Sequence, residues 1–256
     1  MREQVIGYSL AVGLMPINPD GYFLRGQAFY SLDRNVEAID DFTRSLVLHP
    51  RQKEAIHWRG HAYHDNKQFQ KAEEDFTRAL ALRSDDAHLL YCRGLSRLSL
   101  LKIDEALVDL RRSLALNASQ KEEIATTLNN YAWLMVTGSA RHPAPARRLI
   151  DEALQLMPEA SIFLNTYGVV LYRQGKYSQA VIALEKSLQN SQGEHDGFDL
   201  YFLAMCHACL NDQHKAQDCL QRAIAWHEKQ QAKLSGTHQK ELNAFRAEAT
   251  EVVNRK

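Results

Sequence analysis

Four histidines in the first half of the chain stand at spacings that suit a shared metal ion. His57, His61 and His64 follow one another at intervals of four and three residues, with Asp65 next to them and His88 further along. Side chains three or four residues apart lie on the same face of a helix, and imidazole is a common ligand of zinc and related ions. We interpret these histidines as a stripe exposed on a helix. The alternative is a metal site with His57, His61 and His64 as candidate ligands.

The cysteines are weaker candidates for a metal or redox site than the histidines. Cys206 and Cys209 form a CxxC sequence, a spacing found in redox and zinc sites, but no second pair accompanies it and both fall within a predicted helix. Cys92 and Cys219 are isolated in the sequence. We therefore interpret all four as reduced thiols of a cytosolic protein, with Cys206 and Cys209 buried.

Short motifs of common active sites are missing from the sequence. It contains no GxxxxGK phosphate loop, no GxSxG elbow, no HExxH zinc motif and no kinase catalytic loop. The 31 basic and 31 acidic residues balance, so no net charge attracts nucleic acid or an anionic membrane. The apolar runs are shorter than the roughly 20 residues that cross a bilayer. We expect a cytoplasmic protein that is not an enzyme, has no cofactor and binds neither nucleic acid nor membrane.

A period of 34 residues identifies the elements that must carry these side chains. An Arg-Gly pair recurs three times, at Arg25-Gly26, Arg59-Gly60 and Arg93-Gly94. Twelve residues after each glycine stands an alanine, followed after four residues by a large apolar residue and after three more by a small one. Because these intervals share one helix face, the pattern predicts a helix there. The positions are Ala38, Ala72 and Ala106, then Phe42, Phe76 and Leu110, then Ser45, Ala79 and Ser113.

The same frame continues through the second half. The glycine position is taken by Ala132, Gly168 and Ala204, and the alanine position by Ala146, Ala180 and Ala216. We predict six helix-turn-helix repeats, at 19–52, 53–86, 87–120, 125–160, 161–194 and 197–230. Residues 1–16 are predicted to form a leading half repeat. Residues 238–253 are predicted to form a C-terminal capping helix, with Leu242, Phe245, Ala249 and Val252 on its apolar face.

This pattern resembles the tetratricopeptide-repeat family, in particular its bacterial members. The best single match is the second repeat, through Gly60, Tyr63, Ala72, Phe76 and Ala79. Arg97 and His207 depart from it, because the family usually has an aromatic residue there. The resemblance implies an all-α fold, a right-handed α-α superhelical solenoid that spans residues 1–256 as one domain. It also implies a scaffold that binds other proteins.

Small residues are expected to meet where the two helices of a repeat cross. On this view the glycines face alanines or serines of the partner helix, while Phe42 and Phe76 fill the space between successive repeats. The glycines concerned are Gly26, Gly60, Gly94 and Gly168.

In the family, the first helix of each repeat lines a concave groove, and the resemblance transfers this role to fixed positions of this chain. We assign partner binding to the following mostly aromatic, histidine and amide residues: Phe23, Gln27, Tyr30, His57, His61, His64, His88, Tyr91, Asn129, Trp133, Asn165, Tyr172, Phe198 and Tyr201. Such a surface suits an extended peptide or a helix of a partner protein. The amides of Asn129 and Asn165 are candidates to hold a peptide backbone.

One class of partner is disfavoured. Family members that bind acidic chaperone tails use a clamp of lysine, asparagine and arginine, and the matching places here hold Phe23, Gln27, Trp58, His88 and Cys92. We therefore do not expect an acidic chaperone tail as partner. Two alternatives to a general scaffold remain. The chain is a regulatory or substrate-recruiting segment of a larger bacterial enzyme such as a kinase, as its leading half repeat suggests, or the groove histidines bind a metal or small molecule.

Overall fold

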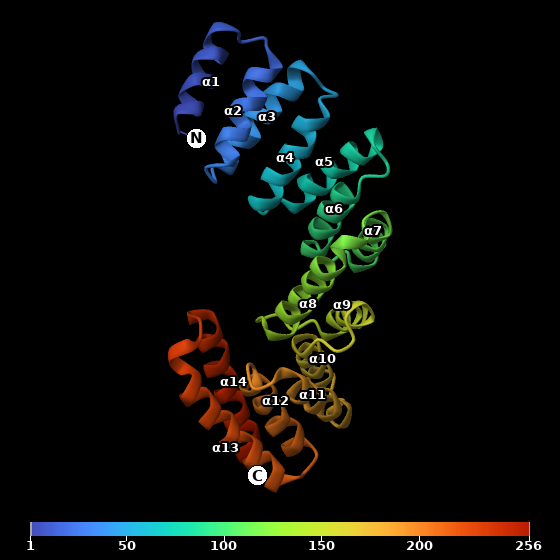
Figure 1. The fold of residues 1–256 in the computed structure, drawn as a ribbon, viewed down its shortest axis with the longest axis vertical. Coiled ribbons are helices and arrows are strands. Elements are labelled where there is room, and N and C mark those ends of the chain that lie inside the picture. The colour runs from blue at the N-terminus through green and yellow to red at the C-terminus, as the bar shows by residue number, and fades with distance from the viewer. Residues whose placement is uncertain (1, 256) are drawn as a thin grey trace. The chain divides into compact units, whose positions relative to one another are not determined.

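Helical hairpins make up the fold. The computed structural model describes residues 2–255, and within this range the regular structure consists of fourteen α-helices and two short 3₁₀ helices (Figure 1). The all-α fold class predicted from the sequence is confirmed. The helices group into two compact units, Met1–Gln120 and Lys121–Lys256. None of the helices within residues 2–255 combines the length and apolarity that crossing a membrane requires.

The N-terminal unit contains three hairpins preceded by a single helix. Helix α2 packs on α3, α4 on α5 and α6 on α7, while α3 contacts α4 and α5 contacts α6, so that each hairpin stacks on the next. Helix α1 packs on α2. The bounds are α1 Arg2–Leu14, α2 Pro19–Tyr30, α3 Asn35–Leu48, α4 Lys53–Asp65, α5 Phe69–Leu82, α6 Ala87–Ser99 and α7 Ile103–Leu116, followed by the 3₁₀ helix Ala118–Gln120.

The C-terminal unit has the same hairpins and one added helix. Helices α8 and α9, α10 and α11, and α12 and α13 pair, and α14 packs on α12 and α13. The bounds are α8 Lys121–Thr137, α9 Pro143–Leu156, α10 Ser161–Arg173, α11 Tyr177–Ser191, α12 Asp196–Cys209, α13 Gln213–Gln230, the 3₁₀ helix Gln231–Lys233 and α14 Gly236–Asn254. On α14 the last buried residue is Val253, whereas Val252, expected on that face, is half-buried. Val253 lies one helical interval of four residues after Ala249.

The repeat glycines make room for large side chains, which corrects the expectation that they face small residues. A Cβ atom at Gly26 would lie 2.8 Å from the ring of Phe42, and one at Gly60 would lie 2.8 Å from the ring of Phe76. A Cβ atom at Gly168 would likewise lie 2.5 Å from the side chain of Leu184. Each large residue therefore packs on the glycine of its own hairpin. Phe42 also belongs to a core cluster with Ala62 of the next hairpin, so it contributes to stacking as well.

A serine near the end of the second helix closes three of the hairpins. The hydroxyl of Ser45 donates a hydrogen bond to the Pro19 carbonyl at 2.9 Å, and Ser113 bonds the Ala87 carbonyl at 2.7 Å. Ser187 bonds the Ser161 carbonyl at 3.0 Å in the C-terminal unit. These bonds tie the second helix to the first turn of the first helix, so the small residue predicted at this position also has a polar role.

Buried ion pairs explain why arginine precedes the glycine in the N-terminal unit. Arg59 forms a two-pronged contact with Asp75, from Nε to Oδ2 at 2.7 Å and from the second terminal nitrogen to Oδ1 at 2.8 Å. Its other terminal nitrogen contacts Thr43 Oγ1 of the preceding hairpin at 3.2 Å. The same geometry joins Arg25 to Asp41 and Arg93 to Asp109. The arginine therefore ties the two helices of one hairpin together and reaches back to the previous one.

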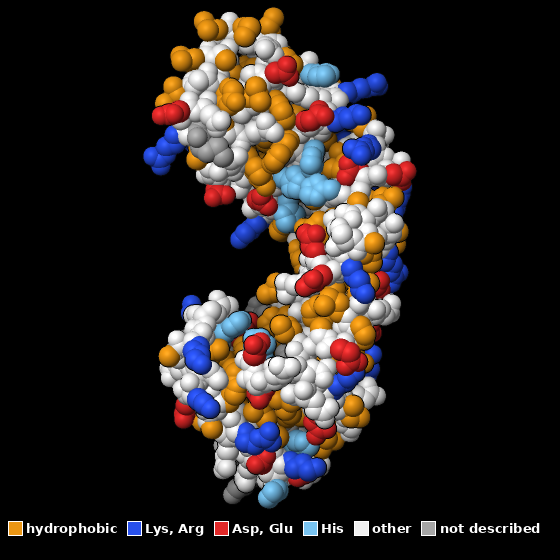
Figure 2. Space-filling view, in the orientation of Figure 1, with side chains coloured by type: hydrophobic (Ala, Val, Ile, Leu, Met, Phe, Trp, Pro, Cys, Tyr) orange, Lys and Arg blue, Asp and Glu red, His pale blue; other side chains and the backbone are white. Residues whose placement is uncertain are grey.

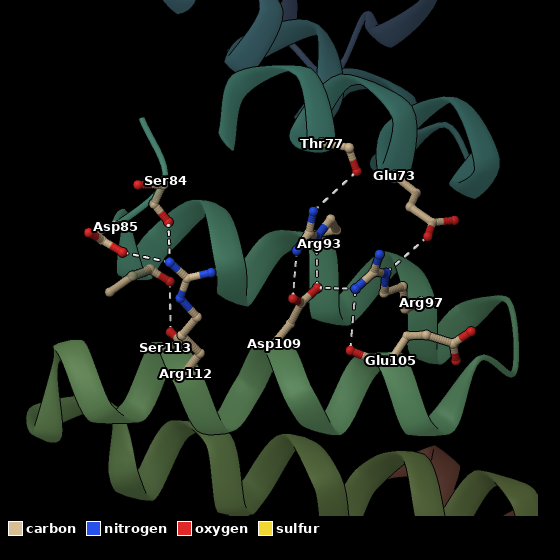
Figure 3. A network of polar contacts seen from close by, with 11 residues as sticks. Glu73, Thr77, Ser84, Asp85, Arg93, Arg97, Glu105, Asp109, Arg112 and Ser113 are labelled. Atoms are coloured by element: carbon tan, nitrogen blue, oxygen red, sulfur yellow. Dashed lines mark hydrogen bonds and ion pairs between the residues drawn. The ribbon is translucent and has the colours of Figure 1, made fainter. Parts of the chain in front are cut away.

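Arg97 enlarges the third ion pair into a network. It contacts Asp109 at 2.7 Å and Glu73 of the preceding hairpin at 2.9 Å, and Lys102 contacts the other oxygen of Glu73 at 2.6 Å. Figure 3 shows Arg93 and Arg97 side by side on Asp109, with Glu73 and Thr77 reaching in from the neighbouring helix. The departure of Arg97 from the usual aromatic residue thus has a structural explanation, because its charge joins two hairpins.

Candidate functional site

The predicted groove residues of the N-terminal unit lie on α2, α4 and α6. Phe23, Gln27 and Tyr30 on α2 are half-buried, as is Tyr91 on α6. The hydroxyl of Tyr30 donates a hydrogen bond to Asp65 Oδ2 on α4 at 2.6 Å. This bond links neighbouring first helices across the surface that the sequence assigned to partner binding.

Three of the four predicted histidines converge on one point of this surface. The Nε2 atom of His61 lies 2.9 Å from Nε2 of His57 and 3.3 Å from Nε2 of His88. The three ring nitrogens lie within 4.8 Å of one another, close enough to share a metal ion. Figure 2 shows a patch of histidine side chains on the N-terminal unit.

His64 does not belong to this group, so the ligand set suggested by the sequence spacing needs correction. Its Nδ1 lies 3.4 Å from Asp65 Oδ1, and its ring contacts Phe69 edge-on at the start of α5. His88 from α6 takes the third place instead. Spacing along one helix identified the pair His57 and His61, whereas the third imidazole comes from the next hairpin.

The environment keeps two of these imidazoles neutral. Burial, together with the neighbouring His88, lowers the pKa of His57 below its usual value. Burial and the imidazoles of His57 and His88 lower the pKa of His61 to about 3. Both side chains therefore carry no charge near neutral pH, which is the protonation state that a metal ligand needs.

A cavity of ≈ 210 Å³ lies among the first helices of the C-terminal unit. Its walls include Asn129 and Trp133 of α8, Asn165 of α10 and Phe198 of α12, which are four of the predicted groove residues. Its remaining walls come mainly from small polar side chains and from α14, namely Asn130, Ser161, Ile162, Thr166, Ser187, Ser191, His195, His238 and Glu241. The structure thus brings these four predicted residues together around one hollow.

Helix α14 covers part of the same surface. The indole N–H of Trp133 donates to Glu241 Oε1 at 3.0 Å, and its ring meets Phe245 edge-on at 5.8 Å. Arg173 at the end of α10 forms an ion pair with Glu248. A helix predicted as an end cap therefore also lies against the inner helices of its unit, which sequence periodicity could not reveal.

Asp199 is a functional candidate that the sequence did not suggest. It is fully buried and contacts two residues that line the cavity: the Asn165 amide donates to Oδ1 at 2.8 Å, and Ser187 Oγ lies 2.9 Å from Oδ2. The single proton of the Ser187 hydroxyl is directed to the Ser161 carbonyl or to Asp199, but not to both. If Asp199 is protonated and donates to Ser187 Oγ, the Ser187 hydroxyl can donate to the Ser161 carbonyl, and all three groups are then hydrogen-bonded. Burial raises the pKa of Asp199 to about 7, in agreement with this arrangement.

Asn129 carries an unusual polar atom in this cavity. Its side chain is 3% exposed, and its Oδ1 has no hydrogen-bond partner within residues 2–255. A buried acceptor without a donor is costly, by about 1 to 3 kcal/mol. The nearby Asn165 amide is committed to Asp199. Of the two asparagines predicted to hold a peptide backbone, Asn129 has a buried acceptor without a partner among the described residues.

The remaining predicted residues of this unit lie in packing contacts. Tyr201 on α12 is fully buried, and its hydroxyl lies 3.3 Å from His227 Nδ1 on α13, so it faces the hairpin interior rather than a groove. Tyr172 on α10 is half-buried against Phe202 and Tyr177.

The CxxC sequence does not place two buried thiols together. Cys206 is fully buried, and burial raises the pKa of its thiol. Cys209, at the last position of α12, is exposed, so the expectation that it is buried is wrong.

Comparisons with known proteins place these hairpins in a family of repeats. Two family models described as Tetratricopeptide repeat match the chain, one at residues 53–86 and the other at residues 158–229. A search of curated proteins found no match.

Among solved structures, YrrB, a TPR protein with an unusual peptide-binding site, is similar with a TM-score of 0.53 and 18% sequence identity, covering 76% of this chain and 96% of YrrB. A tetratricopeptide repeat protein from Parabacteroides merdae gives a TM-score of 0.50 at 20% identity, covering 95% and 91%. MamA 41-end from Desulfovibrio magneticus RS-1 gives 0.51 at 17% identity, covering 69% and 97%. At these identities the likeness concerns the fold.

Proposed function

Because this chain is a tetratricopeptide-repeat protein, we propose that it is a protein-interaction scaffold whose partner site is the cavity between α8, α10, α12 and α14. The partner is a peptide or helix of another protein. The observation that carries the proposal is the buried, unpartnered Oδ1 of Asn129 in the wall of that cavity.

The chemistry of the cavity favours a segment with an apolar side chain and a nearby N–H donor. Trp133 and Phe198 supply aromatic walls, and their rings contact each other edge-on at 6.1 Å. Asn129 supplies an acceptor that gains a hydrogen bond only when a donor enters. A backbone amide beside an apolar side chain meets both conditions. Aromatic walls with a few oriented polar groups are typical of peptide-binding pockets.

Charge argues against an acidic ligand at this place. The residues that line the cavity include Glu241 and no lysine or arginine. An acidic tail would therefore meet a carboxylate and no compensating cation. This agrees with the sequence-based expectation that the partner is not an acidic chaperone tail. The likeness in fold to YrrB, a protein with a peptide-binding site, supports peptide binding as the mode of interaction.

Selection from a random peptide display library on the purified full chain tests the proposal. Peptides selected by the wild type should bind the Asn129→Ala variant about tenfold more weakly, because the hydrogen bond to the buried amide is lost. Asn243→Ala is the matched control, since Asn243 is exposed on α14 and does not line the cavity. Equal affinity of the wild type and Asn129→Ala for every selected peptide would exclude this cavity as the partner site.

A further inference from the structure

We propose that the N-terminal unit holds a transition-metal ion of the zinc class between α4 and α6, with His57, His61, His88 and Cys92 as its ligands. This site belongs to a different unit from the cavity proposed for partner binding, and it uses a cysteine that the sequence pattern left isolated. Two helices contribute two ligands each, and in both helices the two ligands stand four residues apart.

The ligand atoms of His61, His88 and Cys92 already have nearly the spacing that a metal requires. The Cys92 Sγ lies 3.5 Å from Nε2 of His88 and 3.8 Å from Nε2 of His61. The His61 Nε2 lies 3.3 Å from Nε2 of His88. A tetrahedral zinc ion with ordinary bond lengths separates two nitrogens by roughly 3.4 Å and a nitrogen from a sulfur by roughly 3.6 Å. His57 Nε2, at 2.9 Å from His61 Nε2, would have to move away from His61 to complete the coordination sphere.

Without a cation, the Nε2 atom of His61 has more polar neighbours than it can form hydrogen bonds with. The Nε2 atom of His61 lies within 4 Å of two other imidazole nitrogens and of the Cys92 sulfur. In a neutral ring this atom carries either one proton or one lone pair, so it makes only one good hydrogen bond. A metal ion uses the lone pairs of all the atoms at once.

The position of the site determines what a bound metal would do. Helices α4 and α6 are the first helices of consecutive hairpins, and Cys92 belongs to the core cluster that they share. An ion with ligands from both would cross-link the second and third repeats of the N-terminal unit. Because His88 is exposed, the ion can enter from solvent.

Calorimetric titration of zinc into the chelator-treated full chain measures the site. We expect one ion to bind per chain, and His88→Ala to weaken its binding at least roughly 100-fold, since a ligand is lost. His64→Ala is the matched control, because His64 is on the same helix but outside the cluster. Binding no tighter than millimolar in the wild type, or equal weakening by His64→Ala and His88→Ala, would overturn the proposal. Circular dichroism shows whether each variant keeps its helices.

Cobalt in place of zinc tests the cysteine separately. Cobalt bound by a thiolate has a sulfur-to-metal charge-transfer band in the near ultraviolet, which histidine ligands alone do not produce. We expect this band in the wild type and in His64→Ala, and its loss in Cys92→Ser with the visible ligand-field bands retained. A charge-transfer band that survives in Cys92→Ser would overturn the assignment of Cys92 as a ligand.

Discussion

The two units join the two helices of a hairpin with different side chains. In the N-terminal unit the residue before the repeat glycine is arginine, and it pairs with a buried aspartate of the second helix, as in Arg59 with Asp75. In the C-terminal unit the corresponding positions hold apolar or aromatic residues: Tyr131 and Leu149, Tyr167 and Ala183, and Leu203 and Cys219. The hairpin geometry is retained in both. We therefore expect a buried ion pair and a pair of well-packed apolar residues to be interchangeable at this position, since replacing the one by the other is often neutral for stability.

The first helices of the hairpins also differ between the two units: they are more polar in the N-terminal unit and more apolar in the C-terminal unit. In the N-terminal unit they carry imidazoles with hydrogen-bonding atoms near the surface. In the C-terminal unit they carry aromatic rings, and Phe245 of α14 packs against Trp133, Phe198 and Phe202. One unit thus presents polar ligand atoms, whereas the other presents an apolar surface that its own last helix partly covers. This difference is the basis for placing a metal site in the first unit and a peptide site in the second.

Exchange of one ion pair for its apolar counterpart tests the comparison most severely. Asp75→Leu alone leaves the largely buried Arg59 without its carboxylate, and we expect the free energy of unfolding to fall by about 3 to 5 kcal/mol. The double variant Arg59→Tyr with Asp75→Leu copies Tyr131 and Leu149, and it should recover most of that loss. Urea unfolding of both variants measures this. A double variant as unstable as Asp75→Leu would show that the two solutions are not interchangeable.

The buried carboxyl of the C-terminal unit should make stability depend on pH. The pKa of Asp199 is raised to about 7 in the folded state, above its value of 3.8 in a model compound. The folded state therefore binds the proton more tightly, so this contribution is fully present below pH about 4 and is lost as the pH rises through about 7. The loss has a slope of up to about 1.4 kcal/mol per pH unit.

Asp199→Asn should remove this dependence, since an amide does not titrate in this range. The difference in unfolding free energy between Asp199→Asn and the wild type should move in favour of the variant from pH 5 to pH 8. Asp218→Asn serves as the control, because Asp218 is exposed on α13. If the difference for Asp199→Asn stays constant across this range, the carboxyl is already ionised in the folded protein at pH 5.

The smallest effect concerns the turns. Leu101 adopts a left-handed backbone with φ of 59°, where Asn211 of the C-terminal unit has φ of 62°. A leucine is strained in this region, whereas asparagine tolerates it. We expect Leu101→Asn to raise the free energy of unfolding by about 0.5 to 1 kcal/mol and Asn211→Leu to lower it by a similar amount. Thermal unfolding monitors both, and a change of the same sign in the two variants would contradict the equivalence of the turns.

Much of the fold could be predicted from the sequence, because the repeat pattern is local. The helix pairs and the positions of the large residues Phe42 and Phe76 on the second helices follow from residue types within one period. The expectation about which residues the repeat glycines contact was wrong. The glycines lie against the large residues of their own hairpin, because a ring needs the space that a missing Cβ leaves.

The candidate sites could be predicted only in part. Spacing identified His57 and His61, which lie on one helix, but it selected His64 in place of His88 and gave no role to Cys92. In the C-terminal unit it selected Asn129 and Trp133, but the burial of Asp199 had no signal, since an acidic residue in the first turn of a helix is ordinary.

The sequence by itself determined the class of fold and the family of the repeat, because each hairpin is encoded by contacts between residues less than one period apart. Only the tertiary structure decided which side chains form a site. His88 joins His57 and His61 through the stacking of hairpins, and α14 meets Trp133 although more than 100 residues separate the hydrogen-bonded pair. Periodicity specifies which face a residue occupies, but contacts between elements depend on how those faces meet in space.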